Sequence, residues 1–263
     1  KVDDKSLLST LNTDFGEIYR KKGQYHEAEE YYSKSLQSSL ALKNEEGCAV
    51  CYGNLGSCYR AAGKIKEAIE AYEKSLTYSI NINADRLTAN QYGNMGALYY
   101  KQNEFDLSIE YFEKALNIIR KTGNQPALAR TYLSLADIHS TIGNYNETNE
   151  LHEKALKIAK NLGALDLESR VYAGIGKFYV DTDDLVSTLY YYKNSLEIAE
   201  KIEDMRNAAM LHLSIGEIFR IQEEIHEALV HFEKAKVLFE TFGETENIEK
   251  VLQAIYNTKQ FMK

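Results

Sequence analysis

Apolar and small residues recur at helical spacing through almost the whole chain. The segment 52–76 shows the pattern clearly, because it contains two stripes in which such residues return three or four positions apart, as they do on one face of an α-helix. Gly63 lies between the stripes, at a place where a left-handed residue ends a helix. The segment therefore predicts a helical hairpin. Its stripes are Tyr52, Leu55, Gly56 and Tyr59, then Ala68, Ile69, Tyr72, Ser75 and Leu76.

This pattern returns every forty residues without insertion or deletion. The column that contains Gly56 reads Gly16, Gly56, Gly96, Ala136, Gly176 and Gly216. Two further columns, three and sixteen residues later, hold aromatic residues or histidines: Tyr19, Tyr59, Tyr99, His139, Tyr179 and Phe219, then Tyr32, Tyr72, Phe112, His152, Tyr192 and Phe232. A fixed period of this length is typical of stacked repeat proteins. It predicts six hairpins at about 8–44, 45–84, 85–124, 125–164, 165–204 and 205–244.

The fold class follows from the same pattern. Proline occurs once, at Pro126, so almost nothing interrupts the helices, and one hairpin cannot bury its apolar face without a neighbour. We therefore expect an all-α solenoid that forms a single domain over residues 1–263. Within each hairpin, we expect the glycine to face the small residue of the second helix, as Gly56 against Ala68, while tyrosines fill the flanks.

A closing helix is expected at 246–262, with Ile248–Met262 as its amphipathic part. We expect Leu252, Ile255 and Tyr256 to occupy core columns, while the opposite face carries polar residues such as Glu249 and Gln253. A terminal helix with one polar face is what the end of a repeat stack requires.

Composition narrows the functional classes. The net charge is -8 at pH 7, which argues against binding to nucleic acid or to an anionic membrane surface. No apolar run is long enough to span a bilayer, and the first residues lack the pattern of a signal peptide. The chain starts without methionine, which is compatible with a piece of a longer protein. Three cysteines are too few for a disulfide framework, so we expect a reducing, cytoplasmic location.

The repeated phrases "YGNLGSCYRAAG" (52–63) and "YGNMGALYYKQN" (92–103), with their small and aromatic columns, resemble the tetratricopeptide repeat family. The resemblance covers six repeats from about Leu8 to Phe242. The unit has forty residues instead of the usual 34, and it lacks the proline after the second helix. This longer unit is similar to repeats of Pins-type polarity adaptors, kinesin light chain and bacterial signalling proteins. The resemblance implies a right-handed α-solenoid whose first helices line a concave wall.

Charged residues on that wall suggest an acidic ligand. The wall contains eight cationic and five acidic residues, so its net charge is +3, and the remainder of the chain carries -11. Such a groove favours an acidic segment. The cations are Arg20, Lys21, Arg60, Lys101, Arg130, Arg170, Lys177 and Arg220, and the acids are Asp14, Glu17, Asp137, Asp181 and Glu217.

Two asparagines suggest how a peptide is held. Asn54 and Asn94 share a column, and the amide group offers both a donor and an acceptor to a peptide backbone. The preceding Gly53 and Gly93 are unfavourable in mid-helix, and we expect them to make room for a ligand chain. One turn away, Arg130 and Arg170 share a column, and their guanidinium groups can bind carboxylates, although solvated arginines paired with Asp137 or Asp181 are the alternative. The predicted peptide-binding residues are Asn54, Asn90, Asn94, Arg60, Lys101, Arg130, Arg170, Lys177 and Arg220.

Two groups of residues resemble metal or redox sites but are interpreted as structural. Cys48, Cys51 and Cys58 lie on one helix face, where buried thiols behave as small hydrophobic groups. His139 and His152 replace aromatic residues in the fourth repeat, and they would provide two ligands at most if they met across the hairpin. We therefore expect no metal, no cofactor and no catalytic residues.

Two functional hypotheses remain. The first is a non-catalytic interaction scaffold that holds an extended or helical, acidic segment of a protein along the concave wall. The alternative is the ligand-sensing regulatory region of a larger bacterial protein, such as a kinase, a cyclase, a transcription regulator or a peptide-pheromone receptor. An enzymatic hypothesis rests only on the histidines of repeat four. Self-association of the chain is left open, as is use of the convex face.

Overall fold

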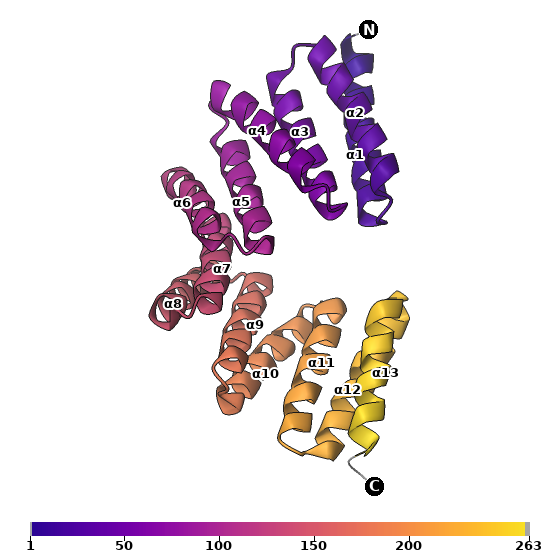
Figure 1. The fold of residues 1–263 in the computed structure, drawn as a ribbon, viewed down its shortest axis with the longest axis vertical. Helices are drawn as coiled ribbons and strands as arrows, with labels where there is room; N and C mark the ends of the chain where they lie inside the picture. The colour runs from indigo at the N-terminus through magenta and orange to yellow at the C-terminus, as the bar shows by residue number, and fades with distance from the viewer. Residues whose placement is uncertain (1, 261–263) are drawn as a thin grey trace. The chain divides into compact units, whose positions relative to one another are not determined.

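The computed structural model describes residues 2–260, and these residues form thirteen α-helices and no strands. This confirms the predicted all-α class for the described part of the chain. Figure 1 shows the helices in chain order. They are α1 (Val2–Lys21), α2 (Tyr25–Ala41), α3 (Glu45–Ala61), α4 (Ile65–Asn81), α5 (Asp85–Lys101), α6 (Phe105–Thr122), α7 (Gln125–Thr141), α8 (Tyr145–Leu162), α9 (Leu165–Asp181), α10 (Leu185–Lys201), α11 (Met205–Ile221), α12 (Ile225–Phe242) and α13 (Thr245–Gln260).

The chain divides into two compact units, Lys1–Ser134 and Leu135–Lys263, and the division falls inside α7. In the N-terminal unit, the hairpins α1/α2, α3/α4 and α5/α6 follow one another (Figure 1). In the C-terminal unit, α9/α10 and α11/α12 pack in the same way, and α13 packs on α12. Both units therefore use the same helical hairpin as their building block.

The turns between helices occur at strict twenty-residue steps. At every step from residue 23 to residue 243, one residue has a positive φ between 52° and 79°. Six of these residues are glycines, which adopt this conformation readily, and six are not. The forty-residue repeat is therefore two equal halves, each consisting of a helix and its turn. The non-glycine turn residues are Lys43, Asn83, Asn103, Asp183, Glu203 and Glu223.

The glycines that recur every forty residues each contact an aromatic ring of the second helix. A Cβ atom at Gly56 would lie 2.6 Å from the ring of Tyr72, and one at Gly176 would lie 2.5 Å from the ring of Tyr192. Such distances leave no room for a side chain. The aromatic ring, which was expected at the flanks, therefore fills the space directly beside the glycine. The small column meets the glycine backbone in the third repeat, since the Ser108 hydroxyl donates to the Gly96 carbonyl at 2.8 Å.

Serine hydroxyls connect the two helices of three hairpins. The hydroxyls of Ser35, Ser75 and Ser195 donate to first-helix carbonyl oxygens 26 residues earlier, at 2.8, 2.6 and 2.8 Å. All three serines are fully buried. Because a buried hydroxyl is costly without a partner, these bonds explain how polar residues can occupy a core column.

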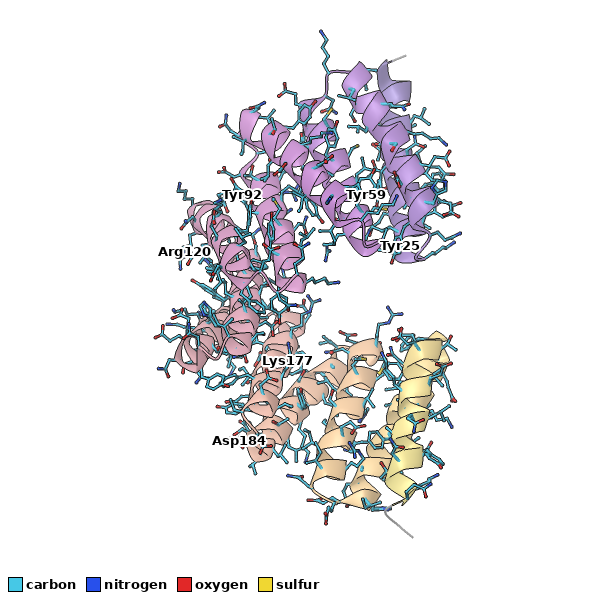
Figure 2. The ribbon with its side chains drawn as sticks, viewed as in Figure 1. Tyr25, Tyr59, Tyr92, Arg120, Lys177 and Asp184 are labelled. Carbon is cyan, nitrogen blue, oxygen red and sulfur yellow. The ribbon has the colours of Figure 1, made fainter. Side chains whose placement is uncertain are left out.

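Successive hairpins stack through one face of each first helix. In α3, this face consists of Cys48, Cys51, Leu55 and Cys58, whose exposed fractions are 4% or less. The second helix of the hairpin before covers it: the Cys58 thiol donates to the Tyr25 carbonyl of α2 at 3.3 Å. Figure 2 labels Tyr25 and Tyr59 at this junction. We call the equivalent positions of any first helix its stacking face.

The last helix, α13, buries its stacking face on α12, with Val251 and Thr258 at 0% exposure and Ile255 at 7%. Leu252 and Tyr256 are exposed at 46% and 62%. The prediction was wrong for these two residues, because their columns face a second helix of the same hairpin, and the described chain forms no such helix after α13. The predicted cap residues 261 and 262 lie outside the described residues.

None of the helices described in residues 2–260 is both long and apolar enough to cross a membrane.

Candidate functional site

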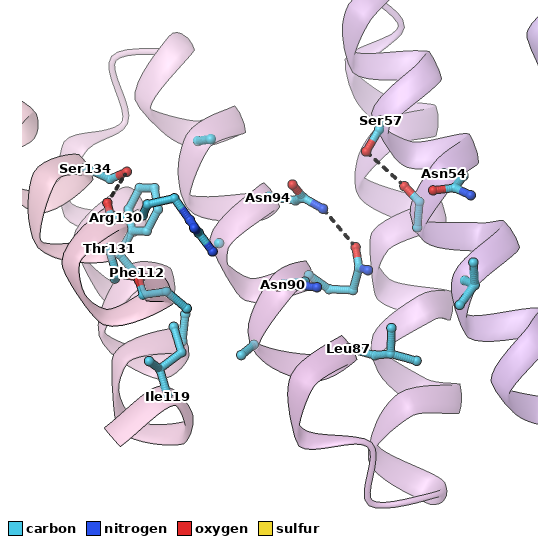
Figure 3. A pocket seen from close by; sticks show the side chains of 18 residues that line it. Asn54, Ser57, Leu87, Asn90, Asn94, Phe112, Ile119, Arg130, Thr131 and Ser134 are labelled. Carbon is cyan, nitrogen blue, oxygen red and sulfur yellow. Dashed lines mark hydrogen bonds between the residues drawn. The ribbon is translucent and has the colours of Figure 1, made fainter. Parts of the chain in front are cut away.

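A pocket of about 440 Å³ opens in the N-terminal unit between first helices α3, α5 and α7, with α6 behind them. Figure 3 shows the side chains of the 18 residues that line it. Phe112, Ala115 and Ile119 of α6 give it an apolar side. Most of the polar groups come from the first helices, and they include Asn54, Ser57, Asn90, Asn94, Arg130, Thr131 and Ser134.

Four of the nine predicted peptide-binding residues therefore line the same pocket: Asn54, Asn90, Asn94 and Arg130. Forty-residue spacing places Asn54 and Asn94 on equivalent positions of consecutive first helices, which explains why both reach this space. Asn90 lies one turn before Asn94 on the same helix. The grouping makes an amide-rich surface beside one arginine.

The Asn94 side chain is held by Gln91, which the sequence reasoning missed. The Nδ2 group of Asn94 donates to Oε1 of Gln91 at 3.1 Å, and Gln91 is only 5% exposed. This bond fixes the amide plane and leaves Oδ1 and the second N–H of Asn94 available to a ligand. A signal existed in the sequence, because Gln91 is a polar residue in a column that otherwise stacks hairpins.

The two glycines that were expected to make room for a ligand differ. A Cβ at Gly53 would lie 2.6 Å from Nε2 of Gln91, so the free space beside Gly53 is filled by that side chain. The prediction for Gly53 was therefore wrong, since this glycine accommodates an internal amide. Gly93 has no atom within 4 Å of the equivalent position and lines the pocket. Its absent side chain leaves open space.

Arg130 supplies the charge of the pocket. Its side chain extends from α7 toward α5 in Figure 3. Among the described residues that line the pocket, Arg130 is the one charged side chain, and no aspartate or glutamate is present. An anion that enters the pocket thus meets a guanidinium group without competition from a lining carboxylate.

The other five predicted residues do not line this pocket. Arg60 and Lys101 belong to the N-terminal unit, and the buried Nε of Arg60 has no hydrogen-bond partner among the described residues. Arg170, Lys177 and Arg220 belong to the C-terminal unit. Lys177, labelled in Figure 2, pairs with Asp137 at 3.0 Å, an acid that was considered as a partner for Arg130 or Arg170.

Arg220 is also paired, with Glu217 at 2.7 Å. In the N-terminal unit, Arg20 pairs with Glu17 at 2.7 Å and Lys21 with the same carboxylate at 3.6 Å. Glu17 and Glu217 are among the five acids already subtracted in the count of +3, so these ion pairs leave the net charge unchanged and show which cations are paired.

The three cysteines are buried and unpaired with one another in disulfides. Burial raises the pKa of all three thiols, which keeps them protonated and makes them poor metal ligands and nucleophiles. The Cys51 thiol donates to the Ser35 hydroxyl at 3.2 Å. These contacts fit the structural interpretation, and no group of three or more potential metal ligands occurs among the described residues.

The histidines of the fourth repeat make separate contacts. His139 Nδ1 lies 3.4 Å from the Asn144 amide nitrogen, while His152 is 4% exposed and packs edge-on against Phe178. Burial lowers the pKa of His152 to about 4. In the fourth repeat, His152 occupies the column that holds a tyrosine or phenylalanine in the other hairpins. The same repeat has Ala136 in the glycine column, so a smaller ring accompanies the added methyl group of the alanine.

A pair of histidines that the sequence reasoning missed lies in the sixth repeat. His212 Nδ1 and His231 Nδ1 are 2.9 Å apart, so one ring donates to the other. Burial lowers the pKa of each imidazole to about 4. Column comparison would have found the pair, because repeats three and five hold Tyr92 with Tyr111 and Tyr172 with Tyr191 at these positions.

Comparison with protein families gives one match, described as "Tetratricopeptide repeat", over residues 6–79 and 87–161, which is more than half of the chain. Among curated protein sequences, nothing matches.

Several solved structures have the same fold. BtubC (BKLC) from P. vanneervenii has a TM-score of 0.70 and 17% identity, with coverage of 82% of this chain and 91% of that one. A Rap protein complexed with competence and sporulation factor has a TM-score of 0.70 and 12% identity, with coverage of 97% and 75%. A STAND protein from Pyrococcus horikoshii with a tetratricopeptide repeat sensor has a TM-score of 0.70 and 17% identity, with coverage of 94% and 41%. These similarities confirm the solenoid type of fold.

Proposed function

Because the chain belongs to the tetratricopeptide repeat family, we propose that it is a non-catalytic interaction scaffold that binds a peptide segment of a protein partner. The segment is extended or helical and acidic by preference, and it lies in the pocket formed by α3, α5, α6 and α7. The observation that carries the proposal is the composition of this pocket, in which amides and one arginine line a space without carboxylates.

The chemistry of the lining matches a peptide. Asn54, Asn90 and Asn94 offer donors and acceptors to backbone amides, and the apolar side formed by Phe112 and Ile119 receives a side chain. Gly93 leaves space for a backbone to approach α5 closely. Arg130 then selects an aspartate or glutamate side chain, or a terminal carboxylate.

The charge distribution supports an acidic segment in place of nucleic acid or an anionic membrane. The whole chain carries a net charge of -8, which repels polyanions at long range, whereas the pocket itself carries only a positive charge. A short peptide can satisfy the local charge without covering the acidic surface. A cytoplasmic location belongs to the same proposal.

The complex of the structurally similar Rap protein with competence and sporulation factor also supports this function. The predicted residues Arg60, Lys101, Arg170, Lys177 and Arg220 remain part of the proposal as secondary contacts along the first helices. The main contacts are assigned to Asn54, Asn90, Asn94 and Arg130, because all four line the same pocket.

The direct test is binding of the chain to arrays of acidic, neutral and basic peptides. We expect capture of acidic peptides that weakens with salt, and a loss of tenfold or more in the triple variant Asn54→Ala, Asn94→Ala, Arg130→Ala. Hydrogen bonds to charged groups contribute about 1.5–3 kcal/mol each, so the combined loss is easily measured.

A matched control is Asn146→Ala, Asn149→Ala, Lys157→Ala, which removes two amides and one cation from exposed positions of α8 outside the pocket. This variant should bind as the wild type does. Equal binding by both triple variants would refute the pocket as the site, and preferential capture of basic peptides would refute its selectivity.

A second function is favoured by the similarity to the STAND protein, whose repeat region is a sensor. The chain spans 41% of that protein. In this alternative, the same pocket binds a ligand that regulates an attached output domain. The complete reading frame distinguishes the scaffold from the sensor. An output domain fused to these residues would favour the sensor if the activity of that domain changed when the peptide bound.

A further inference from the structure

A second pocket, of about 580 Å³, opens in the C-terminal unit where α11 packs against α10 and α12 (Figure 1). Its wall is apolar, His212 of α11 forms part of the lining, and the exposed charged residues Glu200, Glu233 and Lys234 complete it. A pocket of this size and composition is typical of small-molecule sites. The apolar residues are Met205, Ala208, Val237 and Leu238.

The column of His212 explains why space is available here. Repeats two to five hold a tyrosine in this column, and repeat six holds a histidine. In repeats three and five, the centroid of the tyrosine ring lies 6.1 Å from that of a partner ring on the second helix, whereas the centroids of His212 and His231 are 5.0 Å apart. A smaller ring that lies closer to α12 therefore leaves space that a tyrosine ring fills elsewhere. The tyrosines are Tyr52, Tyr92, Tyr132 and Tyr172.

Two contacts hold the His212 ring in this position. Its Nε2 atom faces the Glu200 carboxylate at 3.6 Å, and because a carboxylate only accepts, Nε2 carries the proton of the neutral ring. The Nδ1 atom of His212 is then the acceptor in the 2.9 Å contact with Nδ1 of His231. The hydrogen bond between the histidines keeps the smaller ring toward α12, beside the pocket.

An exposed valine extends the apolar wall to the surface in this repeat alone. Val237 lines the pocket and is 58% exposed. Its column is polar in the other five hairpins, as expected for a position in contact with water. The valine therefore adds apolar surface where only the sixth repeat has a pocket of this kind to line. The polar residues of the column are Gln37, Thr77, Asn117, Lys157 and Glu197.

Lys234 indicates that an occupant has an aromatic ring. In repeat two, the equivalent Lys74 places its ammonium group 5.5 Å from the ring centroid of Tyr52, the tyrosine of the His212 column, and the same arrangement recurs in repeat three at 5.9 Å. Lys234 makes neither an ion pair nor a ring contact within residues 2–260. An aromatic ring in the pocket would give Lys234 the cation–π contact that its equivalents have.

Glu200 indicates a hydrogen-bond donor at the end of that ring. In repeat four, the equivalent residue is Arg120, whose guanidinium group donates to the hydroxyl of the column tyrosine, Tyr132, at 3.4 Å. The hydroxyl of a ring in this column thus lies beside the position that Glu200 occupies in repeat six. A carboxylate there accepts a hydrogen bond where the arginine donates one.

We infer that this pocket binds a small molecule with a neutral aromatic ring and a hydrogen-bond donor, such as a phenol. The ring takes the place that the column tyrosine has in other repeats, Lys234 lies over its face, and its hydroxyl donates to Glu200. The pocket shares no residue with the peptide pocket of the N-terminal unit, so this inference is independent of the proposed function.

The test uses p-cresol, the free-molecule equivalent of a tyrosine side chain, and the chain labelled with carbon-13 at its methionine methyl groups. Met205 lines the pocket, while Met95 is buried in the N-terminal unit and serves as a reference. We expect a saturable ring-current shift of the Met205 methyl signal, with a dissociation constant of about 1 mM, and no shift for Met95.

Two related compounds separate the ring from the hydroxyl. Toluene lacks the hydroxyl group, and 4-methylcyclohexanol lacks the aromatic ring. In competition with p-cresol, each should bind at least about threefold more weakly.

The variant His212→Tyr, His231→Tyr restores the tyrosine pair of repeats three and five and fills the pocket from inside. It should bind p-cresol at least tenfold more weakly. The matched control is His139→Tyr, His226→Tyr, which makes the same two changes outside the pocket and should bind as the wild type does.

A third variant tests the cation–π contact at an exposed position, where folding is not at risk. Lys234→Met keeps a long side chain but removes the charge. It should weaken binding of p-cresol by about threefold and leave binding of 4-methylcyclohexanol unchanged.

Three results would overturn the inference. The Met205 signal could show no saturable shift with p-cresol, or the tyrosine variant and its control could bind p-cresol equally. Equal affinity for p-cresol, toluene and 4-methylcyclohexanol would show unspecific association with an apolar surface. Peptide binding to the N-terminal unit is measured separately, so none of these results bears on the proposed function.

Discussion

Gly56 and Gly93 both lie in the middle of first helices, but their surroundings are opposite. Beside Gly56, the ring of Tyr72 occupies the space that a Cβ would need. Beside Gly93, no atom lies within 4 Å, and the space belongs to the pocket. The comparison shows that glycines with the same helical cost serve two purposes here, close packing inside a hairpin and open space between hairpins.

The strongest test of this difference places valine at each glycine. Gly56→Val should lower the free energy of unfolding by roughly 2–3 kcal/mol, because the buried ring of Tyr72 must move. Gly93→Val should change it by less than about 0.5 kcal/mol, since the side chain enters open space. Urea unfolding followed by circular dichroism measures both. Equal losses in the two variants would contradict the assignment of these glycines.

A second test compares the same columns in repeats three and six, where Tyr92 and Tyr111 correspond to His212 and His231. The pKa of each histidine is about 4 in the folded chain, below the value of about 6.5 for a free imidazole. The unfolded chain therefore binds more protons between these values. The stabilisation is complete above about pH 6.5 and is lost as the pH falls toward 4.

We expect the wild type to lose roughly 3 kcal/mol more stability between pH 7 and pH 5 than the variant His212→Tyr, His231→Tyr, since each histidine contributes about 1.5–2 kcal/mol. The variant restores the tyrosine pair of repeat three and leaves His152 in place as an internal reference. Urea midpoints at the two pH values give the comparison. Identical pH dependence in both chains would show that the pair does not titrate on unfolding.

The smallest expected effect concerns the turns. Glu203 has a φ of 59° and is exposed, while Gly163 occupies an equivalent turn with a φ of 61°. Because the left-handed conformation strains a residue with a Cβ, Glu203→Gly should stabilise the chain by about 1 kcal/mol. Gly163→Ala should destabilise it by a similar amount. Thermal unfolding measures both changes, and a loss of stability in Glu203→Gly would contradict the explanation.

The sequence was sufficient for the fold because the repeat aligns equivalent positions six times. Columns reveal which residues face a partner, and the glycine and aromatic columns indeed meet within each hairpin. Columns do not reveal which atoms fill a given space. For this reason Tyr72 was placed at the flanks although its ring lies directly beside Gly56, and Gly53 was assigned to a ligand although Gln91 fills the space beside it.

The grouping of Asn54 and Asn94 in one pocket was predictable, because periodicity places both on equivalent positions of neighbouring first helices. Gln91 was not predicted, because its role depends on a hydrogen bond between neighbours on one helix. Lys177 and Arg220 were counted as available cations, although their nearest acids neutralise them. Local ion pairs depend on side-chain conformations that a pattern of residue types does not contain.

The twenty-residue spacing of the turns has a consequence for how such a chain can change in length. A deletion of forty residues joins helices whose faces are already in register, since each removed unit contains one first helix, one second helix and their two turns. A deletion of one residue within a helix rotates everything beyond it by about 100°. Duplication or loss of whole genetic repeats thus preserves the architecture, whereas a small insertion within a helix breaks it.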